Sequence, residues 1–326
     1  MTSSAARHLL NPLASAEQVK NTPSRQDELS RQLETNMRTY GCLLIQQAGI
    51  HLKAPQVLMT TASVLFQRFF YVSSMRSFSV KDIAAAALFL ASKLEEHPIR
   101  IRDLINCFDY LIRLVDYEAQ QIELERISGT PIASSSVQNF KYKPMDYFAK
   151  EYYDWKDDIV IAESQILKRL GFNTVVQNPY GSIVNYLQVL NLTDHPEVTQ
   201  RAWSFANDFL LTPLLATHPP HLISVACVYL AVLVSRPQVV LPMEPAPWFT
   251  LFDVATEEEI WQACKVLLEV YQTWSGSTDW LVESETSAAD GAINKPLVER
   301  LSIWRRAAQL DLPLTKAEVR AIVDKT

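Results

Sequence analysis

A lysine and a glutamate interrupt two strongly apolar stretches of this chain, and both side chains are suited to polar recognition. Lys93 follows the apolar part of the run "IAAAALFLASKLEE" (83–96), and Glu163 lies within "VIAESQILKRL". A lysine ammonium offers three hydrogen-bond donors, and a carboxylate accepts bonds from amides. The two can bond to each other or hold the backbone of another protein. The plainest alternative, which the chemistry alone favours, is two charges on a solvated helix edge.

The helices that must position these charges recur along the chain. Pro55-Gln-Val recurs as Pro196-Glu-Val 141 residues later, and Leu90-Ala recurs as Leu230-Ala 140 residues later. A later helix recurs at an offset of 101, which predicts an insertion of 39 residues in the first copy, at about 116–149. The sequence therefore predicts two helical repeats. The alternative is one helical domain whose apolar helices look alike by chance.

The repeat shows that neither charge is required by the fold. Lys93 corresponds to Leu233 in the second copy, and Glu163 corresponds to Cys264. Each charged residue of the first copy is thus replaced by an uncharged one in the second. A residue that the fold does not need is a candidate for a role in binding.

Local signals predict helices throughout, and we find no hairpin signal. Helices are expected from Pro55, from 80 to about 95, from Ile101 to near Leu114, from near Asp154 to Leu170, and from about 257 to 274, on the basis of 3.6-residue apolar spacing, caps and terminal charges. We expect the following organisation: a flexible N-terminal segment (1–23), a first repeat (24–172) with the surface insertion, a second repeat (178–275), and a linker with a C-terminal helical tail (276–326).

Composition narrows the class of protein. The 326 residues include 7 glycines and carry a net charge of −6, with lysines and arginines scattered along the chain. This disfavours a direct nucleic-acid interface, which usually needs a basic stripe. We expect no membrane span, no secretory signal, no cofactor and no metal site, because the cysteines and histidines lack ligand spacing. No glycine-rich phosphate loop or Gly-x-Ser-x-Gly string points to an enzyme.

Several strings resemble the cyclin family, most closely its L-type branch. They are "LASKLEEHPIRIRDLINCF" (90–108), "GCLLIQQAGIHLKAPQVLMTTASVLFQRFFY" (41–71), "NYLQVL" (185–190) and "WFTLFDVATEEEI" (248–260). The resemblance covers about residues 22–274. It implies an all-α fold of two tandem five-helix cyclin-box repeats. It also implies a nuclear, non-catalytic regulatory subunit that activates a cyclin-dependent kinase in transcription and pre-mRNA splicing.

The resemblance assigns roles to particular residues. In cyclins, a lysine and a glutamate at the positions of Lys93 and Glu163 hold the backbone of the kinase's regulatory C helix. Apolar residues that pack on the same kinase helix map onto Leu90, Leu94, Leu167 and Phe172. The implied complex is a one-to-one heterodimer, with splicing or transcription factors as possible further partners and no direct contact to nucleic acid or membrane.

Some features depart from the family pattern and leave alternatives open. Of the Met-Arg-Ala-Ile-Leu string with which cell-cycle cyclins dock substrates, this chain keeps only Met37 and Arg38, which puts that groove in doubt. The sequence shows no arginine-serine tail, and Leu297, Leu301, Trp304 and Ala308 can line a short amphipathic helix instead. The rivals are a cyclin of the T, K or C branch, and a DNA-binding protein like general transcription initiation factor B.

Overall fold

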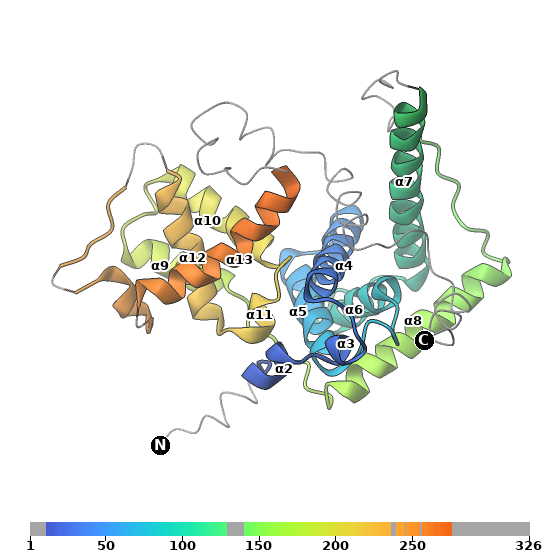
Figure 1. The fold of residues 1–326 in the computed structure, drawn as a ribbon, viewed down its shortest axis with the longest axis horizontal. Coiled ribbons are helices and arrows are strands. Elements are labelled where there is room, and N and C mark those ends of the chain that lie inside the picture. Colours follow the sequence, from blue (N-terminus) through green and yellow to red (C-terminus); the bar gives the residue numbers. More distant parts are fainter. Residues whose placement is uncertain (1–10, 129–139, 236–238, 245, 255, 276–326) are drawn as a thin grey trace. The chain divides into compact units, whose positions relative to one another are not determined.

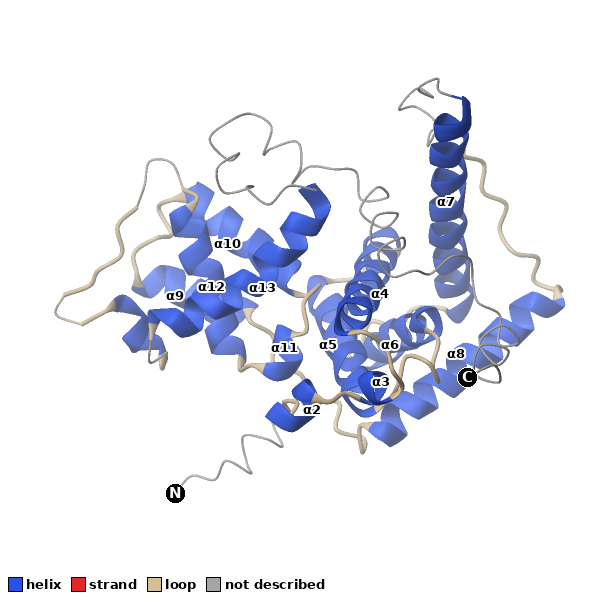
Figure 2. Cartoon of the chain, in the orientation of Figure 1, coloured by secondary structure: helices blue, strands red, loops and turns tan. Residues whose placement is uncertain are grey.

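The computed structural model describes residues 11–128, 140–235, 239–244, 246–254 and 256–275, and every regular element within these ranges is a helix (Figures 1 and 2). The predicted all-α class is therefore confirmed. The chain divides into two compact units. The first unit comprises residues 20–174, and the second comprises residues 11–19 and 175–275. None of the described helices is both long enough and apolar enough to cross a membrane.

A central alanine-rich helix organises the first unit. This helix, α6 (Val80–Leu94), carries four consecutive buried alanines at 84–87. Small side chains let the neighbouring helices approach closely. The helices that pack against it are α4 (Arg31–His51), α5 (Gln56–Val72), α7 (Ile101–Ser128) and α8 (Lys150–Arg169).

Two glycines set the distance between α4 and α5. A Cβ built on Gly41 would lie 2.1 Å from Cζ of Phe66, and one on Gly49 would lie 2.3 Å from the sulfur of Met59. Phe66 is fully buried, so its ring has no open space into which it can move. Glycine is therefore required at Gly41 by close packing and not by an unusual backbone conformation.

A buried arginine, ion-paired within α4, joins α4 to α5 by hydrogen bonds. Arg38 donates to Glu34 Oε1 at 2.8 Å, to the carbonyl of Gln67 at 3.0 Å and to the carbonyl of Phe70 at 2.8 Å. The side chains of Arg38 and Glu34 are only 4% and 1% exposed. Arg38 is thus committed to the interior of this unit.

The N-terminal segment expected to be flexible is packed in part. Residues 16–20 and 23–26 form the short helices α2 (Ala16–Lys20) and α3 (Pro23–Gln26). Thr22 is fully buried, and its hydroxyl donates to Glu34 Oε2 at 2.8 Å. The buried acceptor Glu34 thus holds Thr22 at the start of α3, whereas α2 has no buried residue. Residues 1–10 lie outside the described ranges.

The second unit repeats the arrangement of the first. Its central helix is α12 (Pro220–Leu233), which packs against α9 (Tyr180–Val189), α10 (Pro196–Phe209), α11 (Leu214–Thr217), the 3₁₀ helix η2 (Trp248–Phe252) and α13 (Glu257–Ser275). The pairs α5 and α10, α6 and α12, and α8 and α13 are those that the sequence offsets matched. The short η2 occupies the place that α7 has in the first unit.

The inserted segment begins as helix. The sequence analysis ended this helix near Leu114, whereas α7 continues to Ser128 (Figure 1). Residues 140–149 return without helix, and the hydroxyl of Tyr142 donates to Asp109 Oδ2 and to the carbonyl of Asn106, each at 3.0 Å. The first half of the insertion therefore extends α7, and its last residues are pinned to the same helix. Residues 129–139 and the tail 276–326, including its predicted amphipathic helix, lie outside the described ranges.

Candidate functional site

Lys93 and Glu163 meet on the surface of the first unit. Nζ of Lys93 donates to both carboxylate oxygens of Glu163, at 2.7 and 2.9 Å. Lys93 lies in the last turn of α6, where the helix dipole favours a cation. Glu163 lies in the second half of α8, and its side chain is largely buried. Of the alternatives left open by the sequence, the structure of the free chain shows the intramolecular pair.

Besides their apolar packing, α8 and α6 are joined by polar contacts at two places. Toward the start of both helices, the indole nitrogen of Trp155 donates to Asp82 Oδ1 at 3.0 Å. Lys81 Nζ lies 4.1 Å from the centre of the same indole ring. Lys93 and Glu163 form the second contact, near the end of α6. Ser79 caps the start of α6 by accepting from the amide of Asp82, which stabilises this helix where it meets Trp155.

The ion pair is exposed enough to exchange its partner. The Lys93 side chain is 48% exposed and that of Glu163 is 12% exposed, and the Lys93 ammonium also lies 4.1 Å from the centre of the Phe89 ring. An ion pair with one half-exposed member contributes about 0–1 kcal/mol to stability. The stability of the fold therefore does little to explain why charged residues occupy these two positions. Together they present a cation and a carboxylate at one point of the surface.

Apolar side chains surround the pair unequally. Phe172 is 70% exposed, Leu94 is exposed, and Leu167 is partly buried, whereas Leu90 is 4% exposed and belongs to the core. The structure thus brings Leu94, Leu167 and Phe172 to the surface, and it places Leu90 beneath that surface.

The position of Phe172 follows from how α8 ends. Gly171 and Phe172 both have a φ of about +59°, and the amide of Phe172 donates to the carbonyl of Leu167 at 2.8 Å. Such a left-handed ending reverses the chain directly after the helix. Phenylalanine at positive φ is uncommon, so the backbone holds this exposed ring in a sterically restricted conformation.

The equivalent position in the second unit has no charge pair. Leu233, the counterpart of Lys93, ends α12 and is exposed. Cys264, the counterpart of Glu163, is fully buried, and its thiol lies 3.9 Å from the carbonyl of Ala226. The same packing therefore forms without either charge, as the sequence offsets predicted.

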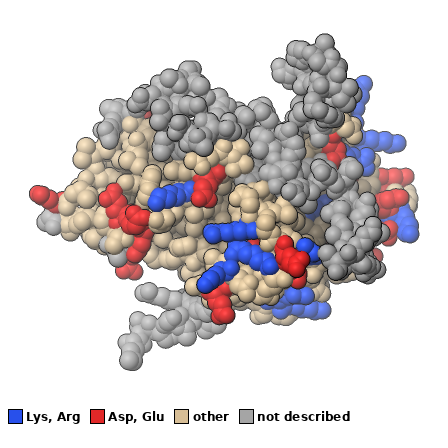
Figure 3. All heavy atoms as spheres, in the orientation of Figure 1, with Lys and Arg blue, Asp and Glu red and all other residues tan. Residues whose placement is uncertain are grey.

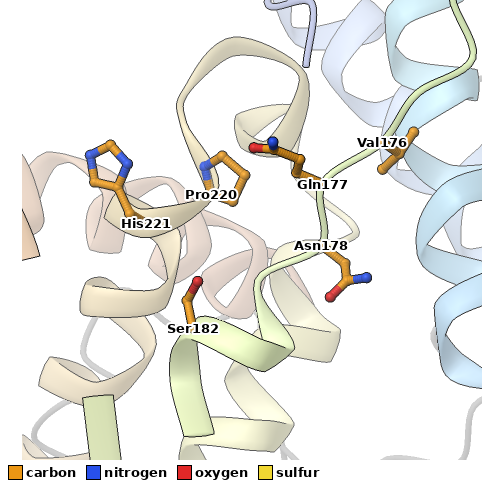
Figure 4. A pocket seen from close by; sticks show the side chains of 6 residues that line it. All are labelled: Val176, Gln177, Asn178, Ser182, Pro220 and His221. Carbon is orange, nitrogen blue, oxygen red and sulfur yellow. The ribbon is translucent and has the colours of Figure 1, made fainter. Parts of the chain in front are cut away.

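Other possible sites offer less chemistry. A pocket in the second unit is lined by Val176, Gln177, Asn178, Ser182, Pro220 and His221 (Figure 4). Its polar groups are two amides, a hydroxyl and an imidazole, and no carboxylate or second imidazole lines it to form a metal or catalytic set. Among the described residues, no cluster of three histidine, cysteine or acidic side chains is arranged to hold a metal ion.

The cysteines are poor nucleophiles where they lie. All four are buried and free of disulfides. Burial raises the pKa of the Cys42, Cys107 and Cys264 thiols to about 12, so very little thiolate forms near neutral pH.

Lysines, arginines and acidic residues of the described ranges lie interspersed on the face drawn in Figure 3.

Sequence reasoning missed the exposed residues along α8 beyond Leu167. Val160 and Ile161 of α8 are exposed, as are Tyr153 in its first turn and Tyr147 and Phe148 just before it. The available signal was the density of aromatic residues in "DYFAKEYYDW" (146–155), which has five aromatic side chains among ten residues.

Two consecutive helical units, each built around a central apolar helix, with a lysine–glutamate pair on the first, agree with the arrangement that the resemblance to cyclins implies. The family described as "Cyclin, N-terminal domain" matches residues 10–128. Human Cyclin-L2 is 39% identical over 264 residues, which are 81% of this chain and 45% of that protein. Human Cyclin-L1 is 41% identical over 255 residues, 78% of this chain and 43% of that protein.

Residues 10–128 thus match a cyclin domain, and about four fifths of the chain is similar to L-type cyclins, as its sequence strings indicated. It spans about half the length of these relatives. The fold is shared with a chain in the crystal structure of the yeast RNA Pol II CTD kinase CTDK-1 complex. That match has a TM-score of 0.56 at 16% identity and covers 95% of this chain and 88% of that chain.

Proposed function

We propose that this chain is the non-catalytic regulatory subunit of a cyclin-dependent protein kinase and binds the C helix of that kinase in a one-to-one complex. The observation that carries the proposal is the exposed Lys93–Glu163 pair with its apolar border, in a chain that matches a cyclin domain over residues 10–128. The L-type relatives and the fold shared with a chain of an RNA polymerase II CTD kinase complex support a nuclear role in transcription and pre-mRNA splicing.

The chemistry of the pair suits a helix backbone. Lys93 has three N–H donors, and Glu163 uses two of them, so the ammonium can donate to a backbone carbonyl in the segment just before a partner helix. The Glu163 carboxylate can accept from amides that have no partner at the start of a helix. Leu94 and Phe172 then lie beside that helix and bury apolar surface against it.

Such binding activates a kinase without chemistry in the cyclin. A kinase needs its C-helix glutamate paired with the lysine that holds the ATP phosphates. If the surface around Lys93 binds the active position of the C helix better than the inactive one, binding shifts the kinase toward its active state. The regulatory effect then equals the difference between the two affinities, so any change that weakens both equally leaves the kinase bound less often but no less active when bound.

The test is to recover partners of the tagged chain from a native extract, identify them by mass spectrometry and measure kinase activity. We expect wild type to recover a cyclin-dependent kinase and Lys93→Ala/Glu163→Ala to lose both the kinase and its activity. A fully active complex of the double variant would show that the roles given to Lys93 and Glu163 are wrong.

A charge exchange supplies the matched control. Lys93→Glu/Glu163→Lys keeps an ion pair between α6 and α8 but exchanges the donor and acceptor positions. If the pair only joins the two helices, this variant will bind the kinase like wild type. If it recognises a helix backbone, the exchange will abolish binding while the melting temperature stays close to that of wild type.

A further inference from the structure

An apolar stripe runs along α8 through the proposed kinase site. Tyr153, Val160 and Leu167 are seven residues apart, so they project within about 40° of one another on the helix. Tyr153 and Val160 are exposed, and Leu167 is partly buried. Glu163 lies on the flank of this stripe. A partner seated on the Lys93–Glu163 pair therefore also lies against the middle of the stripe.

The stripe begins in a cluster of aromatic rings at the start of α8. The ring of Tyr147 lies 5.5 Å from that of Phe148, 5.3 Å from that of Tyr152 and 6.0 Å from that of Tyr153. Tyr152 is buried and anchors the cluster, whereas Phe148 is 84% exposed. We call Tyr147, Phe148 and Tyr153, the three exposed members, the aromatic cluster.

Two members of this cluster, Tyr147 and Tyr153, are held in place by neighbouring side chains. The guanidinium of Arg102, on α7, lies 5.3 Å from the centre of the Tyr147 ring. Tyr152 and Tyr153 contact each other edge to face at 5.4 Å. The Trp155–Asp82 hydrogen bond fixes the same turn of α8 to α6. Rings that are already ordered lose little entropy on binding, which favours their use as contact residues.

The packing of the first unit does not account for Phe148. Its ring contacts the neighbouring Tyr147 but otherwise faces solvent. Contiguous exposed apolar surface of this kind marks an interaction site. Aromatic side chains are also the residues on which binding energy is most often concentrated.

The position of the cluster indicates which partner covers it. Tyr153 precedes Glu163 by ten residues of continuous helix, a distance of about 15 Å. An interface of ordinary size covers about 800 Å² on each partner and is roughly 30 Å across. A protein bound at Glu163 therefore reaches the aromatic cluster along the same helix, with Val160 in between.

We propose that the aromatic cluster is a second contact for the same protein kinase, whose lobe beside the C helix covers α8 and the residues that flank it, from Phe148 to Phe172. This inference rests on the proposed function, because it names the same partner. It adds a contact outside the Lys93–Glu163 site and predicts that affinity is divided between the two.

The test uses the full chain and the kinase catalytic subunit that wild type recovers from the extract. Affinity and dissociation rate are measured by biolayer interferometry for wild type, for Phe148→Ala/Tyr153→Ala and for the control Val189→Ala. Val189 is an exposed apolar residue on α9 of the second unit. We expect the double variant to raise Kd about 10- to 100-fold, mostly through faster dissociation, and the control to leave Kd unchanged.

Two further measurements separate a contact from a folding defect. Melting temperatures of the variants should match that of wild type, because both replaced side chains are exposed. Tyr153→Phe keeps the ring and should retain wild-type affinity. In the wild-type complex, amide hydrogen exchange at residues 147–153 should slow when the kinase is bound, and this measurement needs no variant.

Each outcome decides something different. Unchanged Kd in Phe148→Ala/Tyr153→Ala, together with unprotected amides at 147–153, overturns this inference. If the second contact is overturned but Lys93→Ala/Glu163→Ala still loses the kinase, the proposed function holds without the second contact. If wild type recovers no kinase, both the proposed function and the second contact are wrong.

Discussion

Arg38→Met tests how much the buried guanidinium of Arg38 contributes to the stability of the first unit. Arg38 donates to Glu34, to the carbonyl and side-chain oxygens of Gln67, and to the carbonyl of Phe70, with N···O distances of 2.8–3.1 Å. Its guanidinium also lies 4.3 Å from the centre of the Tyr71 ring. Methionine fills much of the same space but satisfies none of these oxygens.

The expected loss is large for a single substitution. Removing one member of a buried ion pair costs about 3–5 kcal/mol, because the remaining charge is buried without compensation. Arg25 still contacts Glu34 at 3.0 Å, so we expect a value near the lower end, about 3 kcal/mol. For a unit of this size, each kcal/mol lowers the melting temperature by about 2–4 °C, which gives a decrease of about 6–12 °C.

Thermal melting and urea unfolding measure this effect, with Glu34→Gln/Arg38→Met as the control. The control removes both charges, so it should lose less stability than Arg38→Met alone. A melting temperature for Arg38→Met within 2 °C of wild type would refute the argument. Arg38 would then be available for a role at the surface.

Three further predictions concern packing, pH and binding. Gly41→Ala should destabilise the first unit by about 1–3 kcal/mol in urea, because its Cβ would overlap the buried ring of Phe66. Burial raises the pKa of Cys42 to about 12, above the value of an unfolded thiol, so the neutral thiol stabilises the folded state fully below about pH 8.5 and loses this effect as pH rises toward 12. The stability difference between wild type and Cys42→Ala should therefore decrease from pH 8 to pH 10, and a constant difference would contradict this. Phe172→Ser should weaken kinase binding about tenfold in a direct titration and leave the melting temperature unchanged, because this ring is largely exposed.

Most helices were predictable because their signals are local. Proline at the start of α5, the Ser79 cap of α6, and the basic last turn of α8 followed by Gly171 all mark ends that the structure shows. The length of α7 was missed for a different reason. Residues 115–128 contain many good helix formers, but the mismatch between the repeat offsets of 140 and 101 placed an insertion at about 116–149 and so assigned most of them to it.

The sequence predicted which residues form the candidate site, but it did not predict how they lie relative to one another. The offsets singled out Lys93 and Glu163 because their counterparts are uncharged. Whether they bond to each other depends on how α6 crosses α8, which is a long-range property. The exposure of Phe148 is equally invisible in the sequence, since the same aromatic run would fit a buried helix start.

The charge pair on α6 and α8 also has a consequence for valency. A duplicated fold can offer two equivalent docking sites, and a chain with two such sites could bind two copies of the same partner. Here the second unit presents Leu233 and a buried Cys264 at the matching positions, so a ligand that needs an ammonium and a carboxylate side by side finds them in one copy of the two. The corresponding helix ends of the second unit are then free to diverge toward a different ligand, without competition for the kinase.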